Sequence, residues 1–471
     1  MELWQHWLRA AAQLRPACAR TRTFLWLLVV LMAMTTRTDL AGVTSFVRCH
    51  WLHARFYDHL RKFFHSPALP VDRLAVLWVA LCLKLFAPHL VRIHGRVVLI
   101  ADGIKVPKEG KKMPAVKSLH QESQSNSKPT YIMGHSCQTV SLLVHGAQTF
   151  FAVPLISRIH EGLVFSNRSC QTLLDKLVTM LLNLAIDGPF YLVADAYYAS
   201  KKVALPLLKH DQHLVVRIRS NAVAYKPVPR AQQPARGRPR KYGHKLLLRK
   251  QFLPHKLCRA ASPVYGEKSV DIYYRSLTLL WKPLARPVQF IVVEHPTRGR
   301  MILMTTDLDL APLEAIKLYG LRFKIEVGFK QAIHTLGTYA YHFWMQAMKP
   351  IRKGDGDQYL HRASDAYRER VKIKLNAYHR HIQIGLIAQG LMQYLALAHP
   401  ALVWKSFGSW LRTMKPNLEP SEMVVGKALS NQLPLFLINL PNDNMLRIFL
   451  QDKLAPERCP PLLVAAFSQA A

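Results

Sequence analysis

Apolar side chains recur at three- and four-residue spacings through residues 1–90, the period of amphipathic helices. Basic residues such as Arg48, Arg55 and Arg61 lie between them, so the pattern predicts a small helical domain. The run FLWLLVVLMAM (24–34) contains 11 apolar residues, fewer than the ~18 needed to cross a bilayer. We expect this run to be a buried core helix, and a targeting or membrane segment is the alternative.

Strand-like apolar runs begin after residue 90 and alternate with helical segments. The expected strands are RVVLIAD (96–102), TVSLLVHG (139–146), QTFFAVPL (148–155), FYLVA (190–194) and HLVVRIR (213–219). Helices are expected at 169–184 and 199–209. A strand, a hairpin, a helix, a strand, a helix and a strand in this order predict one mixed α/β sheet for residues 91–219.

The rhythm changes in residues 220–307, where a polar, proline-rich segment precedes more strand patterns. These strands are DIYYRSLTLLW (271–281), VQFIVVE (288–294) and MILMTT (301–306), and they predict a β-rich insertion. A long helix is expected from Pro312 within residues 308–345, with Asp307 or Asp309 as its cap. Residues 346–471 are expected to be mainly helical.

The charge balance indicates what kind of partner the protein binds. Lys and Arg number 64 against 28 Asp and Glu, a formal net charge of +36, which indicates a polyanionic partner such as nucleic acid. The basic residues are spread along the chain rather than gathered in one amphipathic helix, which disfavours a membrane surface. Seven cysteines without a C-x-x-C pair indicate neither a zinc ribbon nor a disulfide framework, and fit a reducing cytosol.

Two of the predicted core strands run through apolar residues and then reach a carboxylate. RVVLIAD ends on Asp102, and FYLVA is followed by Asp195. An Asp often closes a strand by hydrogen-bonding a turn, so either residue alone is weak evidence of a site. If the two strands are neighbours, the carboxylates meet at one edge of the sheet, where their repulsion requires a cation.

A third carboxylate lies in the long helix, in LYGLRFKIEVGFKQ. Tyr319, Arg322, Glu326 and Lys330 are spaced three, four and four residues apart and share one helix face. Such a stripe is also typical of a solvated face with ion pairs along the helix. The apolar residues beside it indicate a helix packed on several sides, so we expect the stripe to face a site.

Three carboxylates without a His or Cys cluster form a set of hard oxygen ligands, which suits Mg²⁺ or Mn²⁺ better than zinc. None of the 22 histidines has convincing metal-ligand spacing, and His379 and His381 are expected at the surface. Two such ions about 3.5–4 Å apart can activate a water or a 3′-hydroxyl for phosphodiester displacement. A DNA backbone is the substrate that this basic chain would attract.

The order strand–Asp, hairpin, helix, strand–Asp, insertion, helix–Glu, with the Tyr-x-x-Arg-x-x-x-Glu spacing of residues 319–326, resembles the DDE transposases of bacterial insertion sequences. The resemblance is to the branch with a β-rich insertion before the Glu, and it covers roughly residues 90–345. It implies an α/β fold with an RNase H-like mixed-sheet core, a β-rich insertion and helical regions at both ends. It also implies that Asp102, Asp195 and Glu326 are the catalytic metal ligands.

Further roles follow from the same resemblance. Tyr319 and Arg322 would contact DNA near the scissile phosphate, and Tyr198, at the family's offset after the second Asp, is a further expected DNA contact. The family places a Lys seven residues after the Glu, where this chain has Ile333, so Lys330 or His334 would take its place.

The chemistry implied is cut-and-paste transposition, in which hydrolysis at the transposon ends is followed by attack of the freed 3′-hydroxyl on target DNA. Related members release the second strand through a hairpin and a flipped base, and stacking such a base requires an aromatic side chain. Trp281 and Trp344 are the candidates, and core packing is the alternative for each. A homodimer is expected because a synaptic complex joins two ends, and the expected location is the bacterial cytoplasm, at the nucleoid.

Three basic regions are candidate DNA contacts. Arg236, Arg238 and Arg240 in ARGRPRKYG (235–243) resemble an AT-hook, which inserts into a narrow minor groove. Lys105 begins a lysine-rich loop (105–117) beside the first Asp that could steer phosphates. For these two segments a merely solvated loop is the alternative. Residues 1–90 are the expected module for binding the transposon ends, although no residue there can be assigned to a base.

Two other readings remain. A DNA-binding protein could keep this fold without transposition activity, and it would bind DNA whether or not the three acids were present. A membrane-associated basic protein is the other, although Lys84 interrupts the second apolar run (75–86).

Overall fold

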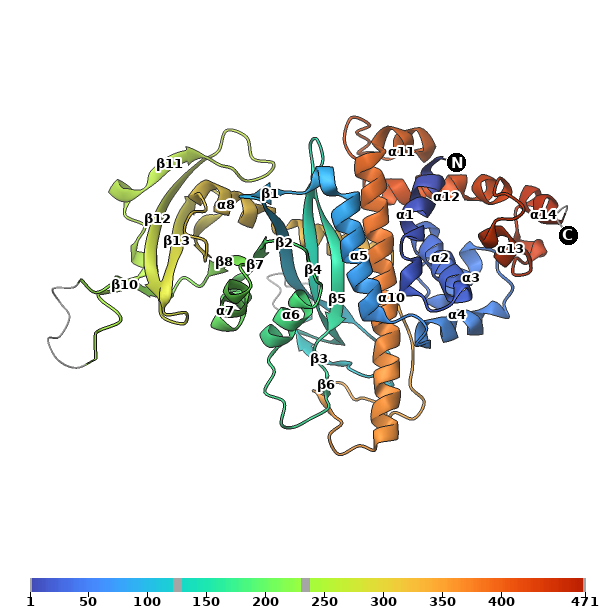
Figure 1. Ribbon diagram of the computed structural model, residues 1–471, viewed down its shortest axis with the longest axis horizontal. Coiled ribbons are helices and arrows are strands. Elements are labelled where there is room, and N and C mark those ends of the chain that lie inside the picture. The colour runs from blue at the N-terminus through green and yellow to red at the C-terminus, as the bar shows by residue number, and fades with distance from the viewer. Residues whose placement is uncertain (1, 122–128, 230–237, 469–471) are drawn as a thin grey trace.

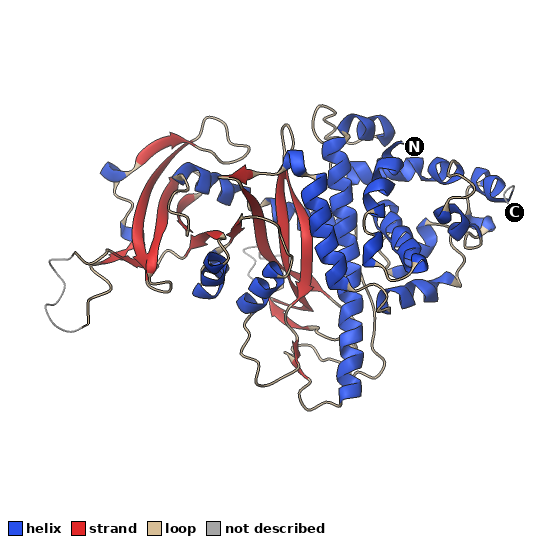
Figure 2. Ribbon diagram, in the orientation of Figure 1, coloured by secondary structure: helices blue, strands red, loops and turns tan. Residues whose placement is uncertain are grey.

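The computed structural model describes residues 2–121, 129–229 and 238–468. A large mixed sheet occupies one end of the molecule and a body of helices the other, with both chain termini among the helices (Figures 1 and 2). The long helix α10 (Asp365–Ala398) runs between the two. The predicted fold class, a mixed α/β sheet flanked by helical regions, is confirmed.

Five strands form the central part of the sheet. Their spatial order is β5 (Phe150–Ile159), β4 (Tyr131–His145), β2 (Arg96–Pro107), β7 (Phe190–Ala194) and β8 (His213–Ile218). Strands β5, β4 and β2 are antiparallel, and β7 and β8 run parallel to β2. Every residue of β7 is buried, which explains its unbroken apolar sequence, because parallel strands are covered on both faces.

Four short strands lie around this core. β1 (Arg92–Ile93) pairs with β2, and β3 (Lys117–His120) pairs with β4. β6 (Leu163–Val164) and β15 (Gln358–Tyr359) form a separate parallel pair.

The predicted insertion extends the same sheet. Its strands are β9 (Val223–Tyr225), β10 (Lys245–Leu247), β11 (Cys258–Ala261), β12 (Asp271–Trp281), β13 (Arg286–His295) and β14 (Gly299–Thr305). Strand β14 pairs antiparallel with β8 along Thr305↔Val215 to Ile302↔Ile218, so the hydrogen-bonding ladder continues from the core into the insertion. The part of the insertion next to the core is therefore held rigidly relative to the core strands.

Helices cover both faces of the core strands. α6 (Leu173–Leu182) and α7 (Lys201–Lys209) pack on one face, against Leu99 and Leu192, and α8 (Pro312–Leu321) and α9 (Lys324–His334) pack on the other, against Ile100 and Val193. The alternation of residues along β2 and β7 assigns each side chain to one of these two layers.

The prediction of a single long helix from Pro312 is wrong, because α8 ends at Leu321 and α9 begins at Lys324. The Ile325 amide bonds to the Arg322 carbonyl and the Glu326 amide to the Phe323 carbonyl, so the chain tightens there to three-residue bonding.

The predicted cap is also wrong, since Ala311 precedes α8 without a side-chain cap. Asp307 instead accepts hydrogen bonds from the Tyr191 hydroxyl and the Asp309 amide.

The helical body joins the two ends of the chain. It contains α1 (Glu2–Ala12), α2 (Thr21–Thr36), α3 (Val43–Cys49), α4 (Phe56–His65), α5 (Val71–Leu85), α11 (Pro400–Phe407), α12 (Glu422–Ile438), α13 (Met445–Gln451) and α14 (Pro461–Ser468). The Trp4 indole donates to the Leu429 carbonyl at 2.9 Å, which ties α1 to α12. Helix α2 is buried from Phe24 to Thr36, so the run FLWLLVVLMAM is the core helix that its length predicted.

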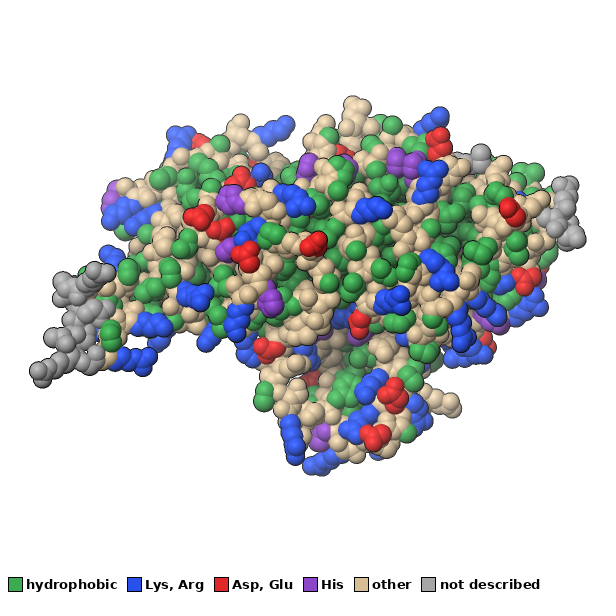
Figure 3. Space-filling view, viewed as in Figure 1, with side chains coloured by type: hydrophobic (Ala, Val, Ile, Leu, Met, Phe, Trp, Pro, Cys, Tyr) green, Lys and Arg blue, Asp and Glu red, His purple; other side chains and the backbone are tan. Residues whose placement is uncertain are grey.

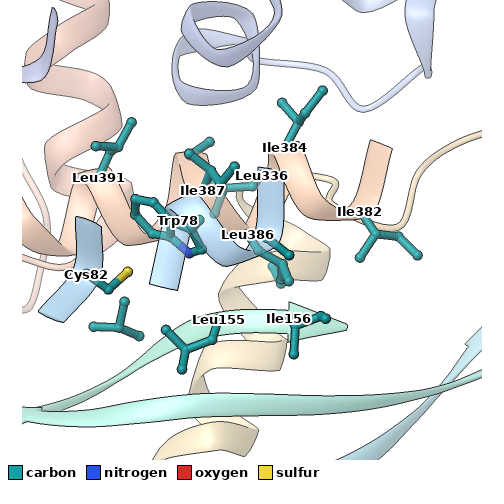
Figure 4. Packing of buried hydrophobic residues seen from close by; sticks show 14 of the residues in the cluster. Trp78, Cys82, Leu155, Ile156, Leu336, Ile382, Ile384, Leu386, Ile387 and Leu391 are labelled. Carbon is teal, nitrogen blue, oxygen red and sulfur yellow. The ribbon is translucent and has the colours of Figure 1, made fainter. Parts of the chain in front are cut away.

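Within the described part of the chain, no single helix is long and apolar enough to cross a membrane, and only α10 and α11, bent by 103°, pass that test as a pair. Helix α10 is buried from Ala377 to Gln393, because it lies between strand β5 and the surrounding helices. Figure 4 shows Trp78 of α5 packed among Leu155, Ile387 and Leu391. A Cβ on Gly390 would lie 2.3 Å from the Trp78 ring, so this close approach requires a glycine.

The expectation that His379 and His381 lie at the surface is wrong. Both are buried on α10, where the Ile159 amide donates to His379 Nε2 and His381 Nδ1 bonds to the Thr338 carbonyl. His379 and His381 lie on different faces of α10, and both are buried because other elements enclose this part of the helix on all sides.

Candidate active site

Asp102 and Asp195 are brought level by the parallel pairing of β2 with β7. The register pairs Ile100 with Val193; Asp102, within β2, and Asp195, directly after β7, each lie two residues further along the chain. Neighbouring strands are about 4.8 Å apart, and a two-residue step keeps a side chain on the same face as Ile100 and Val193. The two carboxylates are therefore neighbours on the face covered by α8 and α9.

Glu326 reaches the same place from α9 through an arginine. Arg322 Nη1 lies 2.7 Å from Asp102 Oδ2, and its Nη2 lies 2.8 Å from Glu326 Oε1. The side chains of Arg322 and Asp102 are 18% and 19% exposed, whereas that of Glu326 is 56% exposed. The tightened turn at the start of α9 thus places one guanidinium between two of the three predicted acids.

The electrostatics of the site are dominated by burial. Burial raises the pKa of Asp102 to about 6; the Arg322 guanidinium and the Gly103 amide oppose this rise, while the negative charges of Asp195 and Glu326 add to it. Burial also raises the pKa of the Tyr198 hydroxyl well above its usual value, and the charges of Asp102 and Asp195 act in the same direction. The site holds clustered negative charge that one Arg partly neutralises.

A groove of about 590 Å³ opens at the two aspartates. Asp102, Asp195, Lys105, Gln138 and Glu161 contribute to its walls. Glu161 is a fourth carboxylate that the sequence pattern did not single out, although it follows the apolar strand β5 much as Asp195 follows β7. Its oxygens accept from Ser136 Oγ at 2.8 Å and pair with Lys117 at 3.3 Å.

The donor chemistry of the site fits a hard divalent cation, because Asp102, Asp195 and Glu326 offer carboxylate oxygens. Among the residues that the structure describes, however, no group of three or more His, Cys, Asp or Glu side chains is arranged to hold a metal ion. Arg322 stands between Asp102 and Glu326, so a positive charge already occupies this position. Metal coordination by all three acids would require this guanidinium to move.

The predicted DNA contacts fall into exposed and enclosed groups. Tyr198 is 2% exposed, whereas Tyr197 beside it is 49% exposed. The Tyr319 ring lies 5.9 Å from the Arg322 guanidinium, and Lys330 is exposed one turn beyond Glu326. Each contact with DNA stays a prediction, and the exposure of Tyr197 makes it the more accessible aromatic after Asp195.

The cations of the two basic segments differ in their surroundings. Lys105 Nζ donates to the His120 carbonyl at 2.6 Å on the wall of the groove. Arg238 and Arg240 are exposed, and Arg236 lies outside the described residues. Figure 3 shows Lys and Arg side chains scattered over the face in view, consistent with the spread seen in the sequence.

The two candidate tryptophans have different surroundings. Trp281 is 5% exposed and lines a cavity of about 550 Å³ with Tyr197, Arg219 and Asn221, next to the segment that follows Asp195. Trp344 is 67% exposed and lines a separate groove with Arg370 and Lys374. Only the first of these cavities shares a residue, Tyr197, with the groove at the aspartates.

Helix α9 is braced from behind by a buried polar cluster. Gln389 Nε2 of α10 donates to the Gly328 carbonyl at 3.1 Å and to Glu422 Oε1 at 3.3 Å, and Gln393 Nε2 donates to the same oxygen at 2.8 Å. Burial raises the pKa of Glu422, and its hydrogen bonds to the two glutamines oppose the rise. The C-terminal helices thereby fix the helix that carries Glu326.

The chain is similar to a known protein family and to a solved structure. The family model described as DDE superfamily endonuclease matches residues 13–262, which include Asp102 and Asp195 and end before Glu326. No curated protein matches the chain. Among solved structures, the chain is similar to the piggyBac transposase in its synaptic complex with hairpin DNA, at 11% identity and a TM-score of 0.34, over 93% of this chain and 81% of that one.

The predicted membership among DDE enzymes is thus confirmed at the level of the superfamily. Since the family match spans more than half of the 471 residues, the chain belongs to the DDE superfamily of endonucleases.

Proposed function

We propose that this protein is a cut-and-paste DNA transposase, which hydrolyses phosphodiester bonds at transposon ends and joins the freed 3′ ends to target DNA. The observation that carries the proposal is the level pairing of Asp102 and Asp195 on neighbouring parallel strands, with Glu326 linked to Asp102 through Arg322. The net charge of +36 supports DNA as the substrate.

Asp102, Asp195 and Glu326 would hold Mg²⁺ or Mn²⁺, as two ions. Such ions, when bound, supply Lewis-acid activation of the attacking water or 3′-hydroxyl and stabilise the leaving oxygen. The role of the protein is to fix the carboxylates on rigid strands, so that little reorganisation is needed during the reaction. Helix α9, braced by Gln389, holds the third carboxylate in place.

Arg322 would change partners when DNA is bound. A guanidinium released from Glu326 can donate two parallel hydrogen bonds to a phosphate, and Tyr319 lies beside it. Lys330 and Lys105 would contact the phosphates on either side, and Tyr198 would support the end of β7 beneath them. The scissile phosphate would then lie where Asp102 and Arg322 meet.

The cavity at Trp281 would receive a base extruded during release of the second strand. Its volume of about 550 Å³ and its position next to Tyr197 support this use. Trp344 remains the second candidate for stacking. The segment with Arg236, Arg238 and Arg240 would bind the minor groove, and residues 1–90 would recognise the transposon ends.

The assembly and its location complete the proposal. A homodimer would hold the two transposon ends in one synaptic complex and deliver them to target DNA. The protein would work in the bacterial cytoplasm, at the nucleoid.

One observation favours a second candidate, a DNA-binding protein of the same fold without transposition activity. In the described part of the chain the three acids are not arranged as a metal site, and Arg322 forms ion pairs with two of them. Such a protein would retain transposon ends without cutting them.

Replacing Asp195 by Asn separates the two functions. DNA carrying the inverted repeats that flank the reading frame is incubated with Mg²⁺, and nicking at the repeat ends is followed on a gel. We expect Asp195→Asn to abolish nicking while DNA retention persists, and Asp187→Asn, an exposed Asp at the other end of β7, to cut as the unmodified protein does. Undiminished cleavage by Asp195→Asn would exclude the proposed chemistry, and binding without cleavage by the unmodified protein would favour the second candidate.

A further inference from the structure

A second basic surface lies outside the groove at Asp102 and Asp195. Three segments build it: the loop 108–112, the segment 344–353 and the first three turns of α10. We call this the α10 basic surface, and its cations are Lys111, Lys112, Lys349, Arg352, Lys353, Arg370 and Lys374.

Backbone hydrogen bonds and a small core hold these segments together. The Ile351 amide donates to the Lys111 carbonyl at 2.7 Å, and the Met345 amide donates to the Lys112 carbonyl at 2.9 Å. Met345 packs with Val371 of α10 in a separate apolar cluster. The cations are therefore mounted on a defined framework rather than on three independent loops.

The charge of this surface is not compensated within the described chain. None of the seven cations forms an ion pair among the described residues, although Lys374 Nζ bonds to His65 Nε2 at 2.8 Å. Glu109 in the first segment and Asp355, two residues after the second, have no ion pair, so seven cations face two such acids, an excess of five. On the same helix, by contrast, Arg368 pairs with Asp365 and Lys372 with Glu369.

Trp344 is the feature that a merely solvated basic surface would lack. Its side chain is 67% exposed, and it lines a groove of about 520 Å³ with His65, Arg370 and Lys374. A large exposed aromatic side chain among cations is typical of surfaces that bind nucleic acid, because cations pair with phosphates while the ring packs on sugars or bases.

We propose that the α10 basic surface binds the phosphate backbone of duplex DNA at a distance from the reacting phosphate, with Trp344 as its uncharged contact. This inference rests on the proposed function for its choice of DNA. It adds a contact surface that involves none of the predicted metal ligands, so binding at this surface and cleavage at the carboxylates are separable.

The salt dependence of DNA binding tests the proposal. Binding of the full-length protein to a fluorescent duplex of about 30 base pairs is measured by anisotropy with EDTA present, over about 50–300 mM salt. Each lost phosphate contact lowers the slope of log K against log salt by about 0.9, so Lys111→Gln/Arg352→Gln/Arg370→Gln should lower it by up to about 2.7. Trp344→Ala should weaken binding severalfold without changing the slope, because its contact is uncharged.

The control removes the same charge from the opposite end of α10. Lys405, Arg412 and Lys415 lie on α11 and the loop after it, and the structure gives them no ion pair among the described residues. Lys405→Gln/Arg412→Gln/Lys415→Gln should keep the original slope.

Equal slopes for the two triple variants would overturn the proposal. A surface that binds an acidic protein rather than DNA predicts this equality, because its cations would not contribute to DNA binding. Failure of the unmodified protein to bind DNA would instead refute the proposed function.

Discussion

Removing the guanidinium of Arg322 is the most direct perturbation of the site. Its two ion pairs, at 2.7 Å to Asp102 and 2.8 Å to Glu326, differ in burial. Breaking a buried pair costs about 3 kcal/mol at the lower end of the usual range, which suits the Asp102 pair. Glu326 is 56% exposed, so screening by solvent limits its pair to under about 1 kcal/mol. We therefore expect Arg322→Gln to lower the free energy of unfolding by about 3–4 kcal/mol without metal.

The same change should strengthen metal binding. In the unmodified protein a cation must displace the guanidinium from Asp102, whereas in Arg322→Gln the carboxylates have no competitor. An ion pair of about 3 kcal/mol corresponds to a factor of about 150 in Kd. A ligand at about 100 times its Kd adds about 2.7 kcal/mol to stability, so Mg²⁺ should restore much of the lost stability.

Thermal unfolding with and without Mg²⁺ measures both effects without depending on cleavage. The control is Lys330→Gln, which removes one positive charge two turns along the same face and breaks no ion pair recorded among the described residues. It should change stability by less than about 0.5 kcal/mol. If Mg²⁺ raises the unfolding midpoints of Arg322→Gln and the unmodified protein equally, Arg322 does not compete with the metal and the reasoning fails.

Two further predictions concern the packing that supports the site. Gly390→Ala should destabilise the fold by about 1–3 kcal/mol in thermal or denaturant unfolding, because the new Cβ would lie 2.3 Å from the buried Trp78 ring; an unchanged midpoint would contradict this contact. Burial lowers the pKa of His135 from 6.5 to about 3, aided by the charge of Lys108. As the pH falls below 6.5 the unfolded chain therefore binds a proton that the folded protein does not bind, and the free energy of unfolding decreases until the pH approaches 3. Between these values His135→Gln should remove about 1.4 kcal/mol per pH unit from the pH dependence of unfolding, and an equally steep dependence would refute the assignment.

The candidate site shows how far local pattern reaches. Asp102 and Asp195 could be identified because each closes an apolar run in a chain with few acids, and Glu326 because it shares a helix face with Arg322. The sequence could not establish that the two aspartates lie side by side, because the pairing of strands depends on residues far apart in the chain. The register Ile100↔Val193 places them side by side.

Other features of the site had weaker signals. Glu161 follows a strand as Asp195 does, but its role on the groove wall depends on where β5 lies beside β4. The pairing of Arg322 with Asp102 joins residues 220 positions apart, and no periodicity indicates it. The choice between Tyr197 and Tyr198 as the exposed ring follows from a three-residue turn after Asp195, which spacing alone does not fix.

The sequence by itself determined the alternation of strands and helices, the basic character of the surface and the carboxylates that close two apolar runs, because each depends on neighbouring residues or on composition. It did not determine that β2 continues past Asp102 to Pro107. Only the tertiary structure decided the register that levels the two aspartates, the break that gives Arg322 its position, and the burial of His379 and His381. These depend on contacts between segments far apart in the chain, where pairing and enclosure are settled by all the elements together.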